Sequence, residues 1–249
     1  MTMNRKTDDT RGLSSLFHLN SEPWLNEQPD PVARATQKVK SYPDADRIAL
    51  PETDPGRVDE LAAARRSVRA FRDEPLPLTD LAALLRSGYA ALGPDRLSSG
   101  QHLLRRPVPS AGGLYPLEIY LLVRNVEGLA TGLYHYDTIG DALELLSEDP
   151  WEAEAEQAFL TWSFMRHAPV IVCIGAVFDR TQDKYGPRGY RYILLEAGHV
   201  AQNLCLASQD SGLSTLCVGG YRDSILNRLF SLNERDEGIV YSVACGVGE

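Results

Sequence analysis

The sequence predicts a layered domain of helices and buried strands, of the α/β or α+β class. Three observations support this prediction. Residues 169–178 form a continuous apolar run rich in valine and isoleucine, which is typical of a buried central strand. Residues 190–211 have the apolar spacing of a long helix that ends at Gly212. Helical and strand-like segments alternate through the second half of the chain without internal repeats.

The first part of the chain has a different character. Residues 1–55 are rich in Asp, Asn, Ser and Pro, and they carry only scattered apolar anchors such as Phe17 and Trp24. We therefore expect an irregular N-terminal arm that packs over another surface. The remaining residues, 56–249, are enough for one domain with a large core.

Local patterns predict the other elements of this domain. Residues 58–65 have a helical pattern, and a second helix begins at Leu78, where Thr79 and Asp80 are a capping signal before an apolar stripe. The elements expected after it are a loop region at 94–114, a strand at 118–126, a hairpin of strands 132–137 and 142–146, a helix at 151–167, a short helix at 222–232 and a final strand at 238–247.

Composition argues against several classes of function. The formal net charge is −9 and the isoelectric point is near 5.1, so we expect no broad positive surface for nucleic acid. The longest apolar runs are far shorter than the roughly 20 residues that cross a bilayer, so we expect a soluble, cytoplasmic protein without a membrane partner. Buried free thiols and no metal site are expected from four cysteines that occur singly in apolar runs, Cys173, Cys205, Cys217 and Cys245.

A cluster of arginines has the chemistry of a phosphate site. Arg65, Arg66 and Arg69 are close together in the sequence, with the hydroxyl of Ser67 among them. Guanidinium groups bind phosphate oxygens bidentately and a serine adds one more donor, so the cluster is suited to a phosphorylated cofactor. A solvated surface cluster is the alternative explanation.

Two glycine-containing segments are suited to the close approach of a flat ligand. In the run Pro109, Ser110, Ala111, Gly112 and Gly113, proline stiffens the entry and the small residues leave the backbone accessible. The pair Gly219 and Gly220 precedes a helix and can present amides to a ring or an anion, although it lacks the spacing of a dinucleotide fold. A plain turn is the alternative explanation for each segment.

Lys184 and Tyr185 lie in a polar, glycine-containing segment before the long helix, and we expect this segment to be a loop. A lysine held there can remove a proton in a redox reaction if another part of the chain binds an electron acceptor. A lysine amine is protonated in water, so this role requires desolvation or neighbouring cations such as Arg188 and Arg191. The alternative is a surface lysine without chemistry.

The remaining polar residues point to no other chemistry. Glu196 and His199 are three residues apart on the long helix and can meet on one face, but no second histidine has metal-ligand spacing. We therefore expect polar pairing in the core or in a dimer. The chain contains no GxSxG, Walker or HExxH motif, so hydrolysis and phosphoryl transfer have no support.

Taken in order, these segments resemble the nitroreductase superfamily and, within it, the SagB-type dehydrogenases, which include FMN-dependent azoline oxidases of ribosomal peptide modification and related domains of peptide synthetases. The resemblance extends from about residue 40 to the C-terminus. It is carried by Tyr42-Pro43, Leu50-Pro51, the cluster at 65–69, residues 109–118, Gly128-Leu129, residues 132–134 and residues 196–203. The superfamily at large shares only the arginine cluster, the Pro-Ser turn and the Gln202-Asn203 helix. These three features by themselves would support no more than a flavin reductase.

The resemblance implies an α+β fold with a central, mostly antiparallel mixed sheet flanked by helices, and an intertwined homodimer with two FMN molecules at its interface. By position, Arg65, Arg66, Ser67 and Arg69 would hold the FMN phosphate, the ribityl chain and the pyrimidine side of the ring. Residues 109–113 would approach from the partner subunit, and Gly219-Gly220 would bring an amide near N5. Classical nitroreductases carry a basic cluster after the last strand; residues 246–249 contain none, so Arg191 is a further phosphate candidate.

The pair Lys184 and Tyr185 matches the Lys-Tyr motif of the SagB-type subfamily. The implied reaction converts a thiazoline or oxazoline to a thiazole or oxazole in a peptide or carrier-bound intermediate. Lys184 would remove a proton, a hydride would pass to flavin N5, and dioxygen would reoxidise the flavin. Tyr185 would orient the substrate or share the proton. A cyclodehydratase or a peptide synthetase would be the protein partner.

Two other functions stay open. The superfamily fold also suits an NAD(P)H-dependent flavin reductase that acts on nitro, quinone or enone substrates. A non-catalytic binding subunit of a peptide-modification complex would use the same fold to recruit a peptide or a cyclodehydratase.

Overall fold

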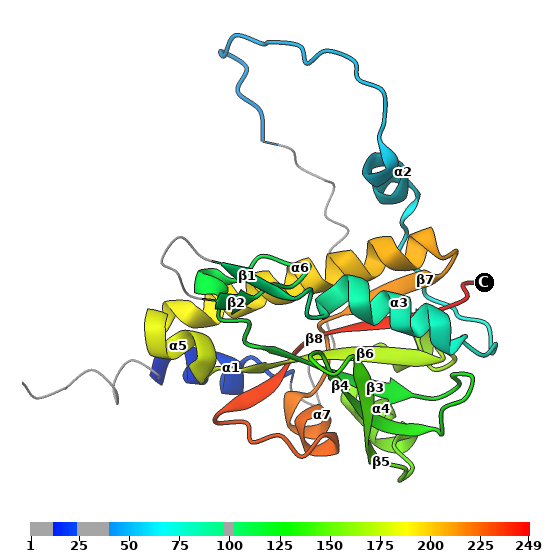
Figure 1. The fold of residues 1–249 in the computed structure, drawn as a ribbon. Coiled ribbons are helices and arrows are strands. Elements are labelled where there is room, and N and C mark those ends of the chain that lie inside the picture. The colour runs from blue at the N-terminus through cyan, green and yellow to red at the C-terminus, as the bar shows by residue number, and fades with distance from the viewer. Residues whose placement is uncertain (1–11, 24–39, 97–101) are drawn as a thin grey trace, which may run out of the picture.

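The computed structural model describes residues 12–23, 40–96 and 102–249. Its centre is a six-stranded sheet in the order β5-β4-β3-β6-β8-β7, with helices above and below (Figure 1). The strands are β3 (Leu117–Val123), β4 (Gly132–Asp137), β5 (Ala142–Ser147), β6 (Val170–Val177), β7 (Ser214–Val218) and β8 (Glu237–Gly246). A separate hairpin pairs β1 (Pro94–Arg96) with β2 (His102–Leu104).

Strand β6 lies inside the sheet, between β3 and β8. Its first seven residues are buried, because helices cover both faces of the sheet at this point. A strand covered on both faces needs apolar side chains on both, which explains the unbroken apolar run. The sequence prediction of a buried central strand is therefore confirmed.

Two helical layers enclose the sheet. On one face, α3 (Leu78–Tyr89) and α6 (Arg188–Asp210) pack on a core that includes Leu84, Ile193 and Val200. On the other face, α4 (Glu152–Ala158) and α7 (Asp223–Leu229) pack on a second core around Trp151. The long helix predicted at 190–211 is confirmed as α6.

Several elements differ from the sequence predictions. The six-stranded sheet is antiparallel at every pairing of described strands rather than mixed, and parallel pairing occurs only at isolated bridges such as that between Ser67 and Thr215. The helix expected at 151–167 ends at Ala158. Helix α3 begins after Pro77 without a side-chain cap. The segment around Lys184 is helix α5 (Asp179–Tyr185), not a loop.

The N-terminal arm is not irregular throughout. Residues Gly12–Asn20 form helix α1, and the ring of His18 hydrogen-bonds to the Tyr190 hydroxyl at 2.9 Å. Helix α1 thus packs on the body of the chain through His18, whereas Trp24 lies outside the described residues. Residues 40–56 are exposed throughout and project away from the layered body before α2 (Arg57–Ala64) (Figure 1).

None of the helices that the structure describes has the length and apolar composition of a membrane span.

Candidate active site

The arginine cluster lies beside the edge strand β7. Ser67 forms a parallel bridge with Thr215, and this bridge ties the cluster to the start of the strand. Arg66 and Arg69 are exposed and Arg65 is half-buried. Within the described residues the three guanidinium groups have no carboxylate partner, and they donate instead to nearby backbone oxygens or to the Ser67 hydroxyl. Their charges are therefore available to an anionic ligand.

The glycine pair lies at the other end of the same strand. The ladder between β7 and β8 ends at Val218, so the amides of Gly219 and Gly220 follow the last paired residue. Four residues from Thr215 to Gly219 correspond to about 13 Å of strand. Among the described residues, a Cβ on Gly219 would meet only the Tyr241 ring, at an ordinary 3.7 Å. Packing within the described part of the chain therefore does not require this glycine, and the bare backbone is left for a ligand.

The proline-glycine turn meets the lysine-tyrosine pair. Ala111–Gly113 form a single 3₁₀ turn, in which Gly112 has a φ of 63°. A Cβ on Gly112 would lie 2.6 Å from the Tyr185 hydroxyl and 2.7 Å from Lys184 Nζ. Lys184 is exposed in the last turn of α5, and Tyr185 packs edge-on against Tyr192 at 5.1 Å. Only a residue without a side chain allows this approach.

The buried carboxyl group of Glu196 is hydrogen-bonded to residues next to the glycine turn. Tyr89 donates its hydroxyl hydrogen to Glu196 at 2.8 Å and accepts one from the Leu117 amide at 3.2 Å. Burial raises the pKa of Glu196, and hydrogen bonds from Ser110 and Tyr89 oppose this rise. Ser110 Oγ also accepts a hydrogen bond from the Tyr115 amide at 2.9 Å. Glu196 therefore links α6 to α3 and to the turn.

Two further side chains of this region carry no motif in the sequence. Tyr89 is fully buried at the end of α3. A buried tyrosine hydroxyl needs a hydrogen-bond partner, so a tyrosine at the end of an apolar helix stripe is the sequence signal that could have identified this residue. Arg106 lies over the Tyr89 ring with 4.3 Å between its Cζ and the ring centroid. Polar pairing in the core is confirmed for Glu196, but its partner is Tyr89 rather than His199, which is exposed.

The predicted site residues fall into two groups that one chain does not bring together. The pKa of the Cys205 thiol is lowered mainly by its hydrogen bond with Cys217 and to a smaller extent by the charge of Arg65, so the arginine cluster is near that part of α6. Lys184 and the turn are near the first residue of α6, Arg188. The 17 positions between Arg188 and Cys205 correspond to about 25 Å of helix. Arg191 is exposed in the first turns of α6 and therefore lies on the side of Lys184, Tyr185 and the glycine turn. We call these residues the lysine group.

The cysteines are free thiols, as expected, and three of the four are buried. Cys205 on α6 and Cys217 on β7 face each other with 3.5 Å between their sulfur atoms. The hydrogen bond from the Cys217 thiol lowers the pKa of Cys205. This pairing of two elements is not visible in the spacing of the residues.

Comparisons with known proteins agree with this architecture. A model described as the nitroreductase family matches residues 62–248. A Methanocaldococcus jannaschii protein named as a nitroreductase is 34% identical over 191 residues, which are 77% of this chain and 92% of the relative. The microcin B17-processing protein McbC of Escherichia coli is 32% identical over 143 residues, which are 53% of this chain and 50% of McbC. The chain thus spans about half the length of that relative in the match.

Solved structures show the same fold. The E. coli microcin synthetase McbBCD complex with truncated pro-MccB17 bound contains a chain that superposes with a TM-score of 0.75 at 22% identity, covering 96% of this chain and 93% of that chain. A Desulfovibrio desulfuricans nitroreductase in complex with FMN superposes with a TM-score of 0.53 at 16% identity, covering 78% of this chain and 88% of the other. The expected nitroreductase-like α+β fold is confirmed, and the chain belongs to the nitroreductase family.

Proposed function

We propose that this protein is an FMN-dependent oxidoreductase of the SagB type, which dehydrogenates an azoline ring in a peptide or carrier-bound intermediate. The observation that carries the proposal is the contact of Gly112 with both Lys184 and Tyr185. It joins the proposed base to a turn that, by resemblance, faces the flavin. Similarity to a microcin-processing protein supports a peptide substrate and a partner that forms the ring.

The edge of β7 has the groups that FMN requires. Arg65, Arg66 and Arg69 would bind its phosphate, since their charges have no carboxylate partner among the described residues. Gly219 and Gly220 would lie against the ring. When bound, FMN supplies the acceptor for a hydride, and dioxygen restores it.

A complete site requires a second copy of the chain. About 25 Å of α6 separates the arginine cluster from Lys184, so one flavin cannot contact both groups of the same subunit. We infer that Lys184 and the turn of one subunit face the flavin held by its partner. A strip on α6 favours this dimer, because Leu194 and Leu195 are 38% and 57% exposed and no described atom lies within 4 Å of the Cβ position of Gly198.

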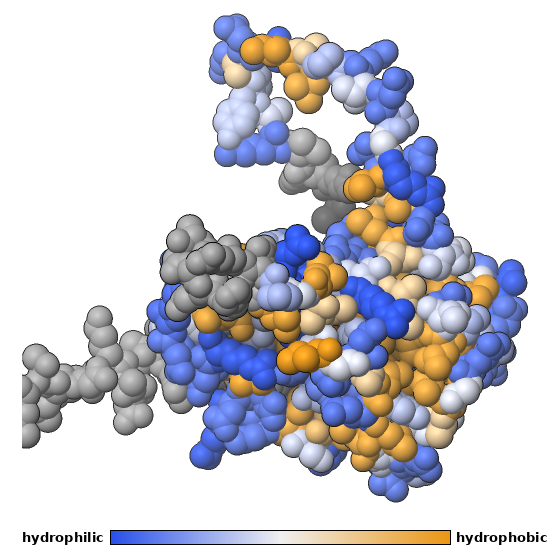
Figure 2. Space-filling model, in the orientation of Figure 1, coloured by the Kyte–Doolittle hydropathy of each residue, from blue (hydrophilic) through white to orange (hydrophobic). Residues whose placement is uncertain are grey.

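The segment before α2 also favours a dimer. Residues 40–56 project from the body with Ile48 and Leu50 each 90% exposed (Figure 2). Apolar side chains in a projecting segment gain stability when a second surface covers them. We infer that this segment lies on the partner subunit.

The proposed chemistry assigns one task to Lys184 and another to Tyr185. An azoline becomes aromatic when one ring carbon loses a proton and its neighbour loses a hydride, so that a double bond forms between them. The neutral amine of Lys184 takes the proton at Nζ. Tyr185, which packs on Tyr192, orients the ring. Because Lys184 is exposed in the single chain, the partner subunit must exclude water from it.

Anaerobic reduction of bound flavin by synthetic thiazoline peptides tests the proposal. We expect the absorbance of oxidised flavin to bleach with the wild-type protein, and Lys184→Ala to keep FMN while losing at least about 100-fold in rate. Arg235→Ala, which removes an exposed positively charged side chain after α7, is the control and should keep the wild-type rate.

Two other results would redirect the assignment. Bleaching by NADPH without turnover of thiazoline, unchanged in Lys184→Ala, would instead identify a nicotinamide-dependent reductase. A protein that cannot take up FMN would be a binding subunit.

A further inference from the structure

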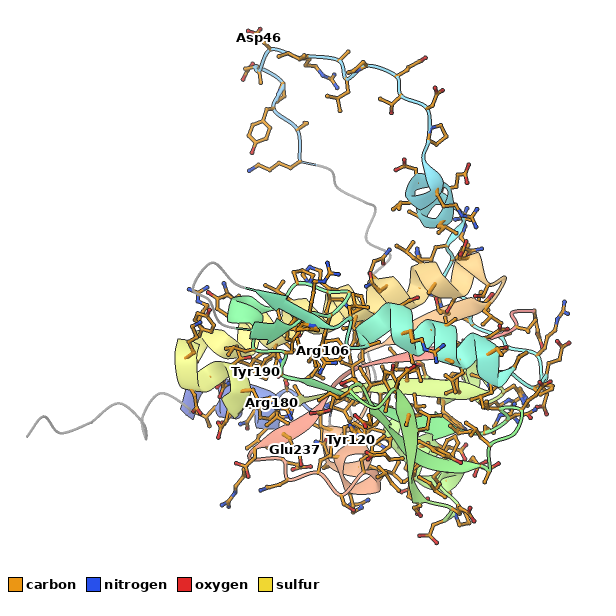
Figure 3. The ribbon with its side chains drawn as sticks, viewed as in Figure 1. Asp46, Arg106, Tyr120, Arg180, Tyr190 and Glu237 are labelled. Carbon is orange, nitrogen blue, oxygen red and sulfur yellow. The ribbon has the colours of Figure 1, made fainter. Side chains whose placement is uncertain are left out.

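A polar cavity lies directly beside the lysine group. It has a volume of about 410 Å³, within the usual range of small-ligand sites. Its walls come from the segment after the glycine turn, from β3, from the end of β4 with the turn that follows, and from α5. The lining residues are Arg106, Leu114, Tyr115, Glu118, His135, Asp137, Thr138, Ile139 and Arg180. Arg106 and Arg180 are labelled in Figure 3.

The cavity is continuous with the residues of the proposed reaction. Leu114 and Tyr115 directly follow the turn whose Gly112 contacts Lys184. Arg180 precedes Lys184 by four residues on α5, which is about one helical turn or 6 Å. A substrate ring beside Lys184 would therefore have its neighbouring atoms at the mouth of this cavity.

The two carboxylates of the cavity already have hydrogen-bond partners within the chain. One oxygen of Glu118 accepts from Arg180 at 2.6 Å, and the other meets His135 Nε2 at 3.1 Å. One oxygen of Asp137 accepts from the Ile139 amide at 2.9 Å, and the Gly140 amide also donates to this carboxylate. Each of the two carboxylates therefore already has two partners from the chain itself, out of about four acceptor positions.

A guanidinium group keeps unused donors. The Arg106 side chain lies 4.3 Å from the centroid of the Tyr89 ring and 5.5 Å from that of Tyr115. Its Nη1 donates to the Tyr89 carbonyl at 2.7 Å, whereas its Nε is buried without a hydrogen-bond partner among the described residues. Arg106 also forms no ion pair within the described part of the chain. A guanidinium fixed in this way is prepared for an oxygen ligand that arrives with the substrate.

We propose that this cavity is a substrate subsite that binds a carboxylate next to the reacting ring, with Arg106 as the specificity-determining residue. The proposal rests on the proposed function, because it assumes that the ring lies beside Lys184. The carboxylate belongs either to an acidic side chain of a peptide or to a free C-terminus, and both present the same pair of oxygens to the guanidinium.

Binding of three short probes to the full-length, FMN-loaded protein tests this subsite. The probes are N-acetyl-diglycine, its C-terminal amide, and N-acetyl-glycyl-aspartate with its C-terminus amidated. Titrations followed by the NMR signals of arginine Nε–H groups give their affinities. We expect at least one carboxylate probe to bind about tenfold more tightly than the neutral amide. The tighter of the two identifies a terminal or a side-chain carboxylate.

Two arginine variants provide the specificity control. Arg106→Gln should abolish the preference for carboxylate, whereas Arg105→Gln should keep it, because Arg105 is exposed and does not line the cavity. Arg106→Lys, which keeps the charge without the planar group, covers the case in which Arg106→Gln fails to fold, and it should retain only part of the preference.

The outcomes separate this inference from the proposed function. Equal affinity for the amide and both acids, or an unchanged preference in a folded Arg106 variant, would overturn the subsite. If the protein turns over thiazoline but binds the amide and both carboxylate probes with equal affinity, the subsite is refuted and the proposed function is not. Carboxylate binding that depends on Arg106, in a protein that oxidises no thiazoline, would support the subsite as a binding site and refute the proposed reaction.

Discussion

Gly112 and Lys184 are so close that a Cβ on the glycine would stand 2.7 Å from the lysine nitrogen. They are 72 positions apart in the sequence, and the fold brings them together where the 3₁₀ turn meets the end of α5. The turn therefore determines where the amine can lie.

Gly112→Ala should displace Lys184 and Tyr185. We expect a loss of about 100-fold in turnover, which a shift of about 1 Å at a reacting group can cause, with FMN still bound. The positive φ adds a destabilisation of about 1 kcal/mol. Gly128→Ala is the matched control, since Gly128 has a φ of 78° but nothing within 4 Å of its Cβ position. Equal effects of the two substitutions on turnover would show that backbone strain, not the contact, is responsible.

Mixed dimers test whether each site uses two subunits. Lys184→Ala and Arg65→Ala proteins should each be inactive, but equal amounts of both, after subunit exchange, should recover about a quarter of wild-type activity. Half of the dimers are then mixed, and each mixed dimer has one intact site. Steady-state turnover after exchange measures this recovery. Activity that stays at the level of the separate variants would contradict a shared site.

The arginine cluster should set the affinity for flavin. Arg66→Gln removes one charge-assisted hydrogen bond to phosphate, so FMN should bind about tenfold more weakly. Quenching of flavin fluorescence on titration gives the dissociation constant. Arg235→Gln removes an exposed positive charge after α7 and should leave the constant unchanged. Riboflavin, which has no phosphate, should show no difference between wild type and Arg66→Gln.

His135 should make stability depend on pH. Hydrogen bonds to Glu118 raise the pKa of His135, and Glu144 contributes in the same direction at 2.7 Å. A raised pKa means that the folded state binds the proton more tightly. The stabilisation is therefore complete below the unfolded value of about 6.5, and it is lost as the pH rises through the folded value.

The His135→Gln variant tests this dependence. At pH 5.5 it should melt about 2–4 °C below the wild type, and at pH 9 the difference should be smaller. Thermal denaturation followed by circular dichroism provides both values. A difference that grows with pH would contradict the assigned direction.

The Tyr89 hydroxyl should contribute to stability because both of its partners are buried. Tyr89→Phe leaves the Glu196 carboxyl and the Leu117 amide each short of one hydrogen bond, so we expect a loss of about 2 kcal/mol in the free energy of unfolding. Urea denaturation measures it. Tyr134→Phe is the control: its hydroxyl donates to the carbonyl of Ala130, an exposed residue, and should cost less than about 1 kcal/mol.

Long elements are predictable from the sequence because packing imposes a pattern on them. Strand β6 and helix α6 are recognisable from apolar runs and spacing alone. Helix α5 is not, since its buried residues are the polar Thr181 and Gln182. Gln182 is held by a hydrogen bond to Ser14 of α1 at 3.0 Å, a tertiary contact with no local signal. Strand β7 has only five residues and is stabilised by its pairing with β8.

In the candidate site too, some features are visible in the sequence and others depend on the complete fold. The residue types of the arginine cluster and the glycine turns suggest a phosphate-bearing cofactor from the sequence alone, and this assignment stays a prediction. The distances between them are not encoded locally, because the contact of Gly112 with Lys184 and the separation along α6 depend on the complete fold. Arg106 has no recognisable signal in the sequence, since its partners, two tyrosine rings, form no charge pattern.

The length of α6 has a consequence for how this protein can change. Under the proposed arrangement, the groups that hold the cofactor are near one end of the helix and those that choose the substrate are near the other. Substitutions around α5 and the cavity can then alter which peptide is accepted without lowering the affinity for FMN. Cofactor affinity and substrate choice become two independent traits, each open to engineering by itself.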